Sequence, residues 1–423
     1  MPDSQSPAPR TTPLAAVHAG LGATMTDFAG WLMPLRYGSE TAEHNAVRNA
    51  AGLFDLSHMG ELIVEGDGAA AALDYALLAD ASAIKPGRAR YTMICAPDGG
   101  VIDDLIVYRL TETSYLVVAN AANAATVAAE LTDRVADRDA TMRDRTDSYA
   151  LIAIQGPRAA TILASLTSTD LDAVRYYASY PATVAGVHAL LARTGYTGED
   201  GFEIFVGPDD AVAVWTALTE AGSAHELVPA GLAARDSLRL EAGMPLYGNE
   251  LSRDMTPFEA GLGRVVKLDK PGDFVGRAAL AERAAAGPTR ELVGLVSKTR
   301  RVPRHGYTVL WDGESSGTVT SGAPSPTLGK PIALAYLTAA GSIIAFTAYV
   351  WLIHHESPTK VGTYAYVNPV VAVAVGYFLG GEVVGPRTLL GTALVLVSVV
   401  VITTAPKKRV EASAAAQASL EAE

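Results

Sequence analysis

Cysteine is almost absent from this chain, since Cys95 is the only one in 423 residues. A single thiol cannot form a disulfide within the chain, and it excludes a metal site built from several cysteines. Such sparing use of cysteine is typical of proteins that work in a reducing compartment. We therefore expect the folded part of the chain to be cytoplasmic.

An excess of positive charge is lacking as well. The chain has 33 lysines and arginines against 45 aspartates and glutamates, a formal net charge of −12. Surfaces that bind nucleic acid normally carry a basic excess, so no nucleic-acid partner is predicted. Residues 1–13 contain no apolar core of a secretory signal, and their serine- and proline-rich composition predicts disorder.

Charge of either sign is missing from three long stretches near the C-terminus, at residues 332–353, 361–381 and 388–406. Each approaches the about 20 residues that a helix needs to cross a bilayer. One stretch alone could be a buried helix of a soluble protein. Three in series, closed by Lys407, Lys408 and Arg409, instead predict two or three transmembrane helices over 339–406 and a charged, alanine-rich tail over 407–423.

The part of the chain before residue 339 has the mixed pattern of an α+β fold. Helix-like runs lie at 69–79, 121–136 and 229–243, and strand-like runs lie at 61–65, 104–110 and 115–119. The runs at 190–193 and 202–206 predict a hairpin around a glycine-rich loop. Short strands at 291–296, 307–311 and 317–320 predict a small β-barrel over 288–338, after a linker at 285–288.

Several long motifs follow one another in this front part. They are MTDFAGWLMP at 25–34, GLFDLSHMG at 52–60, GGVIDDLIVY at 99–108, RTGYTGEDGFE at 193–203, GLAARDSLRLEA at 231–242 and SPTLGKP at 325–331. Together they resemble the T protein, or aminomethyltransferase, of the glycine cleavage system over residues 14–338. The resemblance implies a folate-binding aminomethyltransferase fold, with the catalytic region at 14–284.

This resemblance also implies a reaction. An aminomethyl group would pass from the dihydrolipoyl arm of the lipoylated H protein to tetrahydrofolate, giving 5,10-methylenetetrahydrofolate and ammonia. Tetrahydrofolate would be the acceptor substrate, and no metal is implied. Positioning and charge stabilisation can supply most of the rate enhancement that such a transfer needs.

Asp103 and Asp104 open an apolar strand. On the residues alone, both could simply be carboxylates that cap a turn. Neighbouring strand residues face opposite sides, so only one of the two can enter a given pocket. The resemblance makes Asp104 the catalytic carboxylate beside the reacting folate nitrogens, where it would orient the folate, stabilise positive charge or relay a proton. Asp103 would then face elsewhere.

The resemblance places Glu203 and Tyr196 in the wall that binds the pterin ring. A carboxylate can accept two parallel hydrogen bonds from the amino-pyrimidinone edge of a pterin. Arg235 would order the pocket or the substrate. Without the resemblance, Glu203 reads as a strand residue that faces solvent, and Arg235 reads as part of a surface ion-pair network.

Four further residues complete the predicted folate site. Met59, Tyr91 and Tyr108 would form apolar and stacking walls for a planar ligand, although an ordinary core explains them equally well. Asn120 would hydrogen-bond to folate or cap the helix that follows it, and capping is the simpler explanation.

The apolar C-terminal sequence resembles a different family. Residues 341–351 and 362–371 resemble the last helices of EamA-type drug/metabolite transporters, so the barrel would be truncated and the chain attached to a membrane through 340–406. Two alternatives to the glycine cleavage enzyme follow. The first is a non-catalytic chimeric membrane protein with a vestigial folate domain. The second is a related folate-dependent enzyme, such as those of dimethylglycine or sarcosine oxidation, but no glycine-rich dinucleotide-binding loop is present.

Overall fold

The computed structural model describes residues 8–311 and 313–338, which fall within one compact unit of the chain. The segment at 339–406 and the tail at 407–423, where the sequence predicts membrane helices, lie outside the described residues. Within the described ranges, no helix is both long enough and apolar enough to span a bilayer.

The N-terminal segment is more ordered than we expected, because it pairs with the first hairpin. β1 (Arg10–Thr11) runs parallel to β3 (Trp31–Arg36), and β2 (Thr24–Phe28) lies antiparallel on the other side of β3. The Arg10 guanidinium lies 4.0 Å from the centre of the Trp31 ring, and Thr12 donates a 2.6 Å hydrogen bond to buried Asp55. The predicted disorder of residues 1–13 is therefore wrong for residues 10–12.

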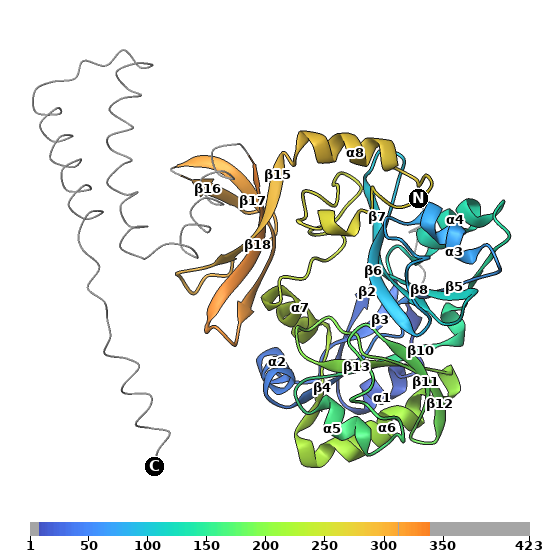
Figure 1. Cartoon of the computed structure of the whole chain (residues 1–423). Coiled ribbons are helices and arrows are strands. Elements are labelled where there is room, and N and C mark those ends of the chain that lie inside the picture. Colours follow the sequence, from blue (N-terminus) through green and yellow to red (C-terminus); the bar gives the residue numbers. More distant parts are fainter. Residues whose placement is uncertain (1–7, 312, 339–423) are drawn as a thin grey trace, which may run out of the picture. The chain divides into compact units, whose positions relative to one another are not determined.

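A five-stranded antiparallel sheet carries the aspartate pair. Its order is β6 (Arg88–Cys95), β7 (Val101–Arg109), β8 (Ser114–Ala119), β5 (Gly60–Glu65) and β9 (Thr141–Asp144). Helices α3 (Ala69–Ala76) and α4 (Ala124–Val135) cover one face of it (Figure 1), where Leu73 and Leu131 are fully buried. The helices and strands predicted in this region are confirmed.

A six-stranded mixed sheet carries the glycine-rich hairpin. Its order is β11 (Ser179–Val184), β12 (Val187–Ala192), β13 (Gly201–Val206), β10 (Ala150–Gln155), β4 (Ala51–Asp55) and β14 (Leu227–Pro229). The predicted hairpin is confirmed, since Leu190 pairs with Phe205. Helices α5 (Ala159–Ala164) and α6 (Ala211–Gly222) pack on one face around buried Trp215, and α1 (Ala15–Gly20) adds Val17 to the same core.

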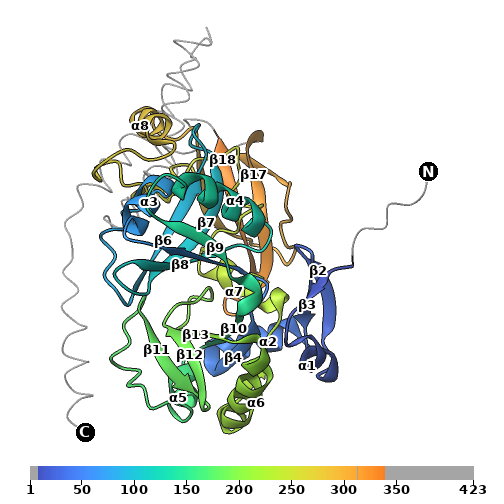
Figure 2. The ribbon, with the colours of Figure 1, turned by 90° about the vertical axis from the view of Figure 1, so that its right-hand side faces the viewer.

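The two sheets repeat one topology. The first follows β5-α3-β6-β7-β8-α4-β9, and the second follows β10-α5-β11-β12-β13-α6-β14. In each, the first strand of the unit lies beside its fourth, and β4 is inserted into the second sheet between β10 and β14. The helix-free faces meet in a shared core that includes Tyr108 and Leu116 from the first sheet and Leu151 and Phe205 from the second (Figure 2). The faces that remain after the helices have packed thus turn toward each other.

Helices α2 (Glu40–Asn49) and α7 (Leu232–Glu241) pack together beside this shared core, and His44 hydrogen-bonds to Ser237 at 2.7 Å. Short 3-10 turns lie at Thr146–Ser148, Pro208–Asp210, Ser223–His225 and Gly263–Val265. The helix predicted at 229–243 is therefore confirmed as α7, with its ends two or three residues inside the predicted ones.

The C-terminal part of the described chain is a four-stranded antiparallel sheet. Its order is β15 (Arg290–Val296), β18 (Lys330–Thr338), β17 (Glu314–Ser325) and β16 (Thr308–Trp311). In the described residues β15 and β16 are edge strands that do not pair with each other. The predicted linker at 285–288 needs correction, because α8 (Arg277–Ala286) extends through its two alanines and ends at Gly287, whose φ is 75°.

Candidate functional site

A β-bulge at the start of β7 sets the direction of the aspartate pair. Ile94 of β6 pairs with Asp103, but Cys95 pairs with Val101, so Ile102 is the extra residue. Beyond the bulge, Leu105 and Val107 pack under the helices, whereas Tyr108 belongs to the core between the sheets. Alternation therefore puts Asp104 on the face shared with Tyr108 and puts Asp103 on the opposite face.

The two carboxylates are nevertheless linked by one asparagine. The Asn120 amide nitrogen donates to Asp103 Oδ1 at 2.9 Å and to Asp104 Oδ1 at 2.8 Å. Asp103 also accepts from the Asn120 backbone N–H at 2.9 Å and from the Asn123 amide at 2.7 Å. Neither asparagine side chain caps α4 in the structure, so the capping interpretation of Asn120 is wrong. Tyr91 donates to Asp104 Oδ2 at 3.1 Å.

Burial controls the protonation of this pair. It raises the pKa of Asp103 to about 7, with the neighbouring Asp104 charge adding to the effect. It raises the pKa of Asp104 to about 6, against the opposing hydrogen bonds from Tyr91 and Asn120. Asp103 is fully buried whereas Asp104 is half-buried. Asp104 is therefore the carboxyl that a ligand can approach, and it changes charge close to neutral pH.

Glu203 lies across the shared core on β13. It is 7 % exposed, and its Oε2 accepts a 3.2 Å hydrogen bond from the Tyr108 hydroxyl and another from Thr194. Burial, followed by the charge of Glu203, raises the pKa of Tyr108, which stays a neutral donor. The interpretation of Glu203 as a strand residue that faces solvent is therefore wrong. Its second oxygen, Oε1, has no hydrogen bond with any described residue and can accept from a ligand.

Glycines and one glutamine shape the loop that precedes Glu203. The Gln155 amide donates to Thr194 O at 3.1 Å and accepts from the Thr197 hydroxyl at 2.9 Å. A Cβ at Gly195 would lie 2.0 Å from Gln155 Oε1, so a larger residue there would displace the Gln155 amide from this position. The loop thereby holds Tyr196, whose hydroxyl donates to the backbone carbonyl of Pro245.

Arg235 is unusual among the charged residues of α7. Its guanidinium lies 4.7 Å from the centre of the Tyr196 ring, and among the described residues it makes no hydrogen bond or ion pair. Burial lowers its pKa, while Tyr196 and Glu203 act in the opposite direction. Its neighbour Arg239 instead pairs with Glu250 at 2.8 Å. The Arg239–Glu250 pair is buried rather than at the surface, and among the described residues Arg235 takes no part in an ion pair. Its N–H donors therefore remain available to a ligand.

The predicted residues thus form three small groups. Tyr91 and Asn120 hold Asp104, Tyr108 holds Glu203, and Tyr196 stacks on Arg235. Met59 follows the turn after β4, is half-buried and packs against the shared core. Electrostatics links the groups, because Asp104 contributes to the raised pKa of both Tyr91 and Tyr196, after the larger effect of burial.

Sequence reasoning missed Tyr177. Burial raises its pKa, and the charges of Tyr176, Glu203 and Asp104 add to that rise. Its φ of 58° is a left-handed conformation that non-glycine residues rarely adopt. Such strain persists where surrounding contacts enforce it, and it gathers at ligand sites. The only signal in the sequence is the Tyr-Tyr pair at 176–177, which carries no motif of its own.

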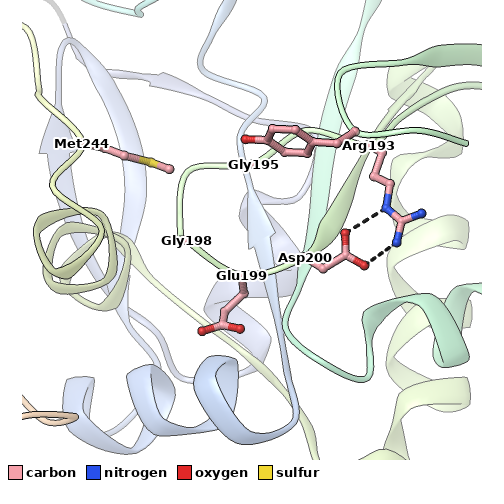
Figure 3. Close-up of a pocket in the computed structure, with 7 residues that line it drawn as sticks. Arg193, Gly195, Gly198, Glu199, Asp200 and Met244 are labelled. Carbon is pink, nitrogen blue, oxygen red and sulfur yellow. Dashed lines mark hydrogen bonds and ion pairs between the residues drawn. The ribbon is translucent and has the colours of Figure 1, made fainter.

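A cavity of about 500 Å³ opens beside this region (Figure 3). Its lining residues are Tyr176, Arg193, Gly195, Gly198, Glu199, Asp200 and Met244. Arg193 forms a 2.6 Å ion pair with Asp200, and Glu199 pairs with Arg48 at 2.8 Å, so the charges of the lining are already balanced. None of the predicted site residues lines it. Within the described residues there is also no cluster of histidine, cysteine and carboxylate side chains that could hold a metal.

Comparisons with known proteins identify the family. A model described as "GCVT N-terminal domain" matches residues 14–270, and one described as "Glycine cleavage T-protein C-terminal barrel domain" matches residues 290–363. A relative from Streptomyces coelicolor named "Aminomethyltransferase" is 66% identical over 331 residues, which cover 78% of this chain and 89% of the relative. The chain belongs to the glycine cleavage T-protein family.

Further members of the T-protein family are similar to this chain over the same share of its length. An aminomethyltransferase from Bacillus subtilis is 46% identical over 329 residues, covering 78% of this chain and 91% of that relative. The crystal structure of glycine cleavage system aminomethyltransferase T from Bartonella henselae matches with a TM-score of 0.73 at 38% identity, covering 78% of this chain and 90% of that one. The chain is therefore an enzyme of the aminomethyltransferase class.

The C-terminal T-family match reaches residue 363, beyond the point at 338 where we expected the resemblance to end. These matches give no support to the transporter likeness predicted for 341–371. That likeness, the truncation of the barrel and the membrane helices concern residues outside the described ranges, and they stay predictions.

Proposed function

We propose that this chain transfers an aminomethyl group from the dihydrolipoyl arm of the lipoylated H protein to tetrahydrofolate in the cytoplasm. The products would be 5,10-methylenetetrahydrofolate and ammonia. The observation that carries the proposal is the environment of Asp104. Its carboxyl is half-buried, it is held by Tyr91 and Asn120, and it lies on the same sheet face as Tyr108, which binds Glu203.

Asp104 would act beside the reacting nitrogens of the folate. A fixed carboxylate stabilises positive charge that develops when nitrogen attacks the methylene carbon, and it can take up a proton from that nitrogen. Tyr91 and Asn120 fix the direction of the carboxylate before the substrate arrives. Such preorganisation is most effective in a partly buried site, where solvent screens the charge less.

Glu203 and Arg235 would recognise the folate itself. Glu203 Oε1 has no hydrogen bond within residues 8–311 and 313–338, and it would accept from the pterin amino-pyrimidinone edge. Tyr196, Tyr108 and Met59 would supply the walls against the ring. The unpaired guanidinium of Arg235 would donate to an oxygen of the bound substrate.

An assay of the complete chain tests the proposal. Aminomethylated H protein and tetrahydrofolate should yield methylenetetrahydrofolate and ammonia in equal amounts, with H protein lacking the lipoyl arm as the negative control. Release of ammonia without methylenetetrahydrofolate would instead favour a reaction that does not use folate. The family match favours catalysis over the non-catalytic chimera as the role of residues 14–270.

The pH dependence of the reaction should report the Asp104 carboxyl. Because burial raises its pKa to about 6, protonation removes the active charge as the pH falls through that value. We expect kcat/KM to fall about tenfold per pH unit below about pH 6. Asp103, with a pKa of about 7, titrates with Asp104, so the apparent values belong to the pair. The same acidic fall in the Asp104→Asn variant would contradict the assignment.

We also propose, from the sequence alone, that residues 340–406 associate with a membrane. Stretches 361–381 and 388–406 would form a hairpin whose turn lies outside the cell and whose Lys407 to Arg409 cluster stays inside. A membrane-impermeant thiol reagent applied to intact cells should label Gly385→Cys and not Asp209→Cys in the enzyme domain. Buried Cys95 gives little background. Labelling of Asp209→Cys from outside would reject this topology.

A further inference from the structure

Glu61 is a buried carboxyl group without a partner. It lies in β5 and is 1 % exposed, and neither of its carboxyl oxygens has a hydrogen bond or an ion pair with any described residue. Buried polar groups are nearly always hydrogen-bonded, so an unpaired carboxyl requires an explanation. Burial, with the nearby charge of Asp144, raises the pKa of Glu61 well above its ordinary value. Only the backbone of Glu61 itself acts in the opposite direction, and no other described residue compensates for this burial.

The strand pattern places Glu61 on the face that carries the site. Leu62 and Val64 of β5 pack under the helices, whereas Ile63 belongs to the core between the sheets. Since side chains alternate along a strand, Glu61 shares the face of Ile63. Met59, the predicted wall residue, comes two positions earlier in the chain. The unpaired carboxyl therefore lies in sequence between two residues that pack against the shared core.

The register across the sheet connects Glu61 to Asp104. Glu61 pairs with Val118, Val118 with Ile106, and Ile106 with Tyr91, so these four side chains form one row across the face. Asp104 is two residues along β7 from Ile106, on the same face. Two strand spacings of about 4.8 Å and one two-residue step of about 7 Å separate the Glu61 backbone from that of Asp104. Glu61 is thus close enough to serve the same reaction, but at a different part of the reacting complex.

A second unpaired group lies three positions earlier in the chain. His58 is 3 % exposed, and its Nδ1 has no partner among the described residues. Burial, followed by the charge of Arg235, lowers its pKa to about 4, so the ring is neutral at pH 7. Among the described residues, seven buried side-chain atoms lack a partner, and three of them belong to His58 and Glu61. These two residues lie on either side of Met59 in the sequence.

We propose that Glu61 is a substrate-binding residue that receives the amino group of the aminomethyl donor. The inference rests on the proposed function. The reaction has three polar demands, namely the pterin edge, the reacting folate nitrogen and the departing amine. Glu203 and Asp104 meet the first two. The amine is the group that offers several N–H donors and carries positive charge when protonated, and an unpaired buried carboxyl is its natural partner. Because Glu61 is covered in the free protein, binding of the donor arm must uncover it.

Binding of the H protein tests the inference without turnover. The complete chain should bind aminomethylated H protein more tightly than dihydrolipoyl H protein, because only the former carries the amine. Glu61→Leu should lose this preference, by about 10- to 100-fold in relative affinity, and Glu61→Gln should retain part of it. Glu65→Gln is the matched control, since Glu65 ends the same strand on the same face and pairs with Arg143 at a half-exposed site.

Three further measurements separate binding from a structural role. The thermal midpoint of Glu61→Leu should be unchanged or higher, because no partner is lost, and tetrahydrofolate affinity should stay within about twofold. In turnover, KM for aminomethylated H protein should rise more than kcat falls. An unchanged preference in Glu61→Leu would overturn the inference, as would a lowered midpoint with a parallel loss of folate binding. An inactive wild-type chain would instead count against the proposed function, and the binding preference would still test Glu61.

Discussion

Replacing Asp104 with asparagine should lower turnover by about 100-fold or more, while tetrahydrofolate binding stays within about tenfold of the wild type. Asparagine keeps the size of the side chain and can still accept from Tyr91, but it carries no charge to stabilise the reacting nitrogen. The loss should therefore appear in kcat, measured as methylenetetrahydrofolate formation at saturating substrates. Folding should not suffer. A carboxyl whose pKa is raised to about 6 favours the folded state only at low pH and loses that contribution as the pH rises through 6.

Asp103→Asn is the matched control for this experiment. Asp103 faces away from the site, so the turnover of Asp103→Asn should fall much less than that of Asp104→Asn. Its carboxylate accepts from the Asn120 and Asn123 amides, and an asparagine would turn one N–H donor toward these donors. An unsatisfied buried group typically lowers the free energy of unfolding by about 1–3 kcal/mol. We therefore expect a lower thermal midpoint in Asp103→Asn. Equal losses of turnover at both positions would contradict the assignment of opposite faces.

Local patterns predicted much of the fold. The alternation over 104–110 and 115–119, the alanine- and leucine-rich runs and the glycine-rich loop correspond to β7, β8, α3, α4 and the β12–β13 hairpin. These features depend on neighbours in sequence, which is why they can be read from one chain. The start of α4 could not be read from the sequence. Asn120 and Asn123 turn toward Asp103, and the helix begins only at Ala124.

What the sequence could not supply are contacts between distant segments. Alternation separated Asp104 from Asp103, but it gave no sign that the Asn120 amide binds both carboxylates. The charged run on α7 predicted a surface network, and only the packing shows that Arg235 is left out of it and stacks on Tyr196. Each of these facts needs the fold of both sheets.

The same reason explains the residues that were missed or misjudged. Tyr177 has no signal in the sequence beyond its pairing with Tyr176, and its left-handed backbone and the effect of the Glu203 charge on its pKa appear only in the folded structure, just before β11. Residues 10–12 read as disordered because their order comes from pairing with Trp31 and Asp55, which lie far along the chain. Function was easier to predict than geometry, because it rests on whole motifs rather than on single contacts.

Glu203→Ala should weaken tetrahydrofolate binding by about 1–3 kcal/mol, because the pterin donors would be buried without an acceptor. Calorimetric titration with a reduced folate measures this directly. The substitution also removes the acceptor of Tyr108 and Thr194, so part of any loss could come from the protein itself. Tyr108→Phe controls for that part, since it removes one donor and leaves the carboxylate in place. The affinity of Tyr108→Phe for tetrahydrofolate should fall less than that of Glu203→Ala. Unchanged affinity in a folded Glu203→Ala variant would remove Glu203 from the folate site.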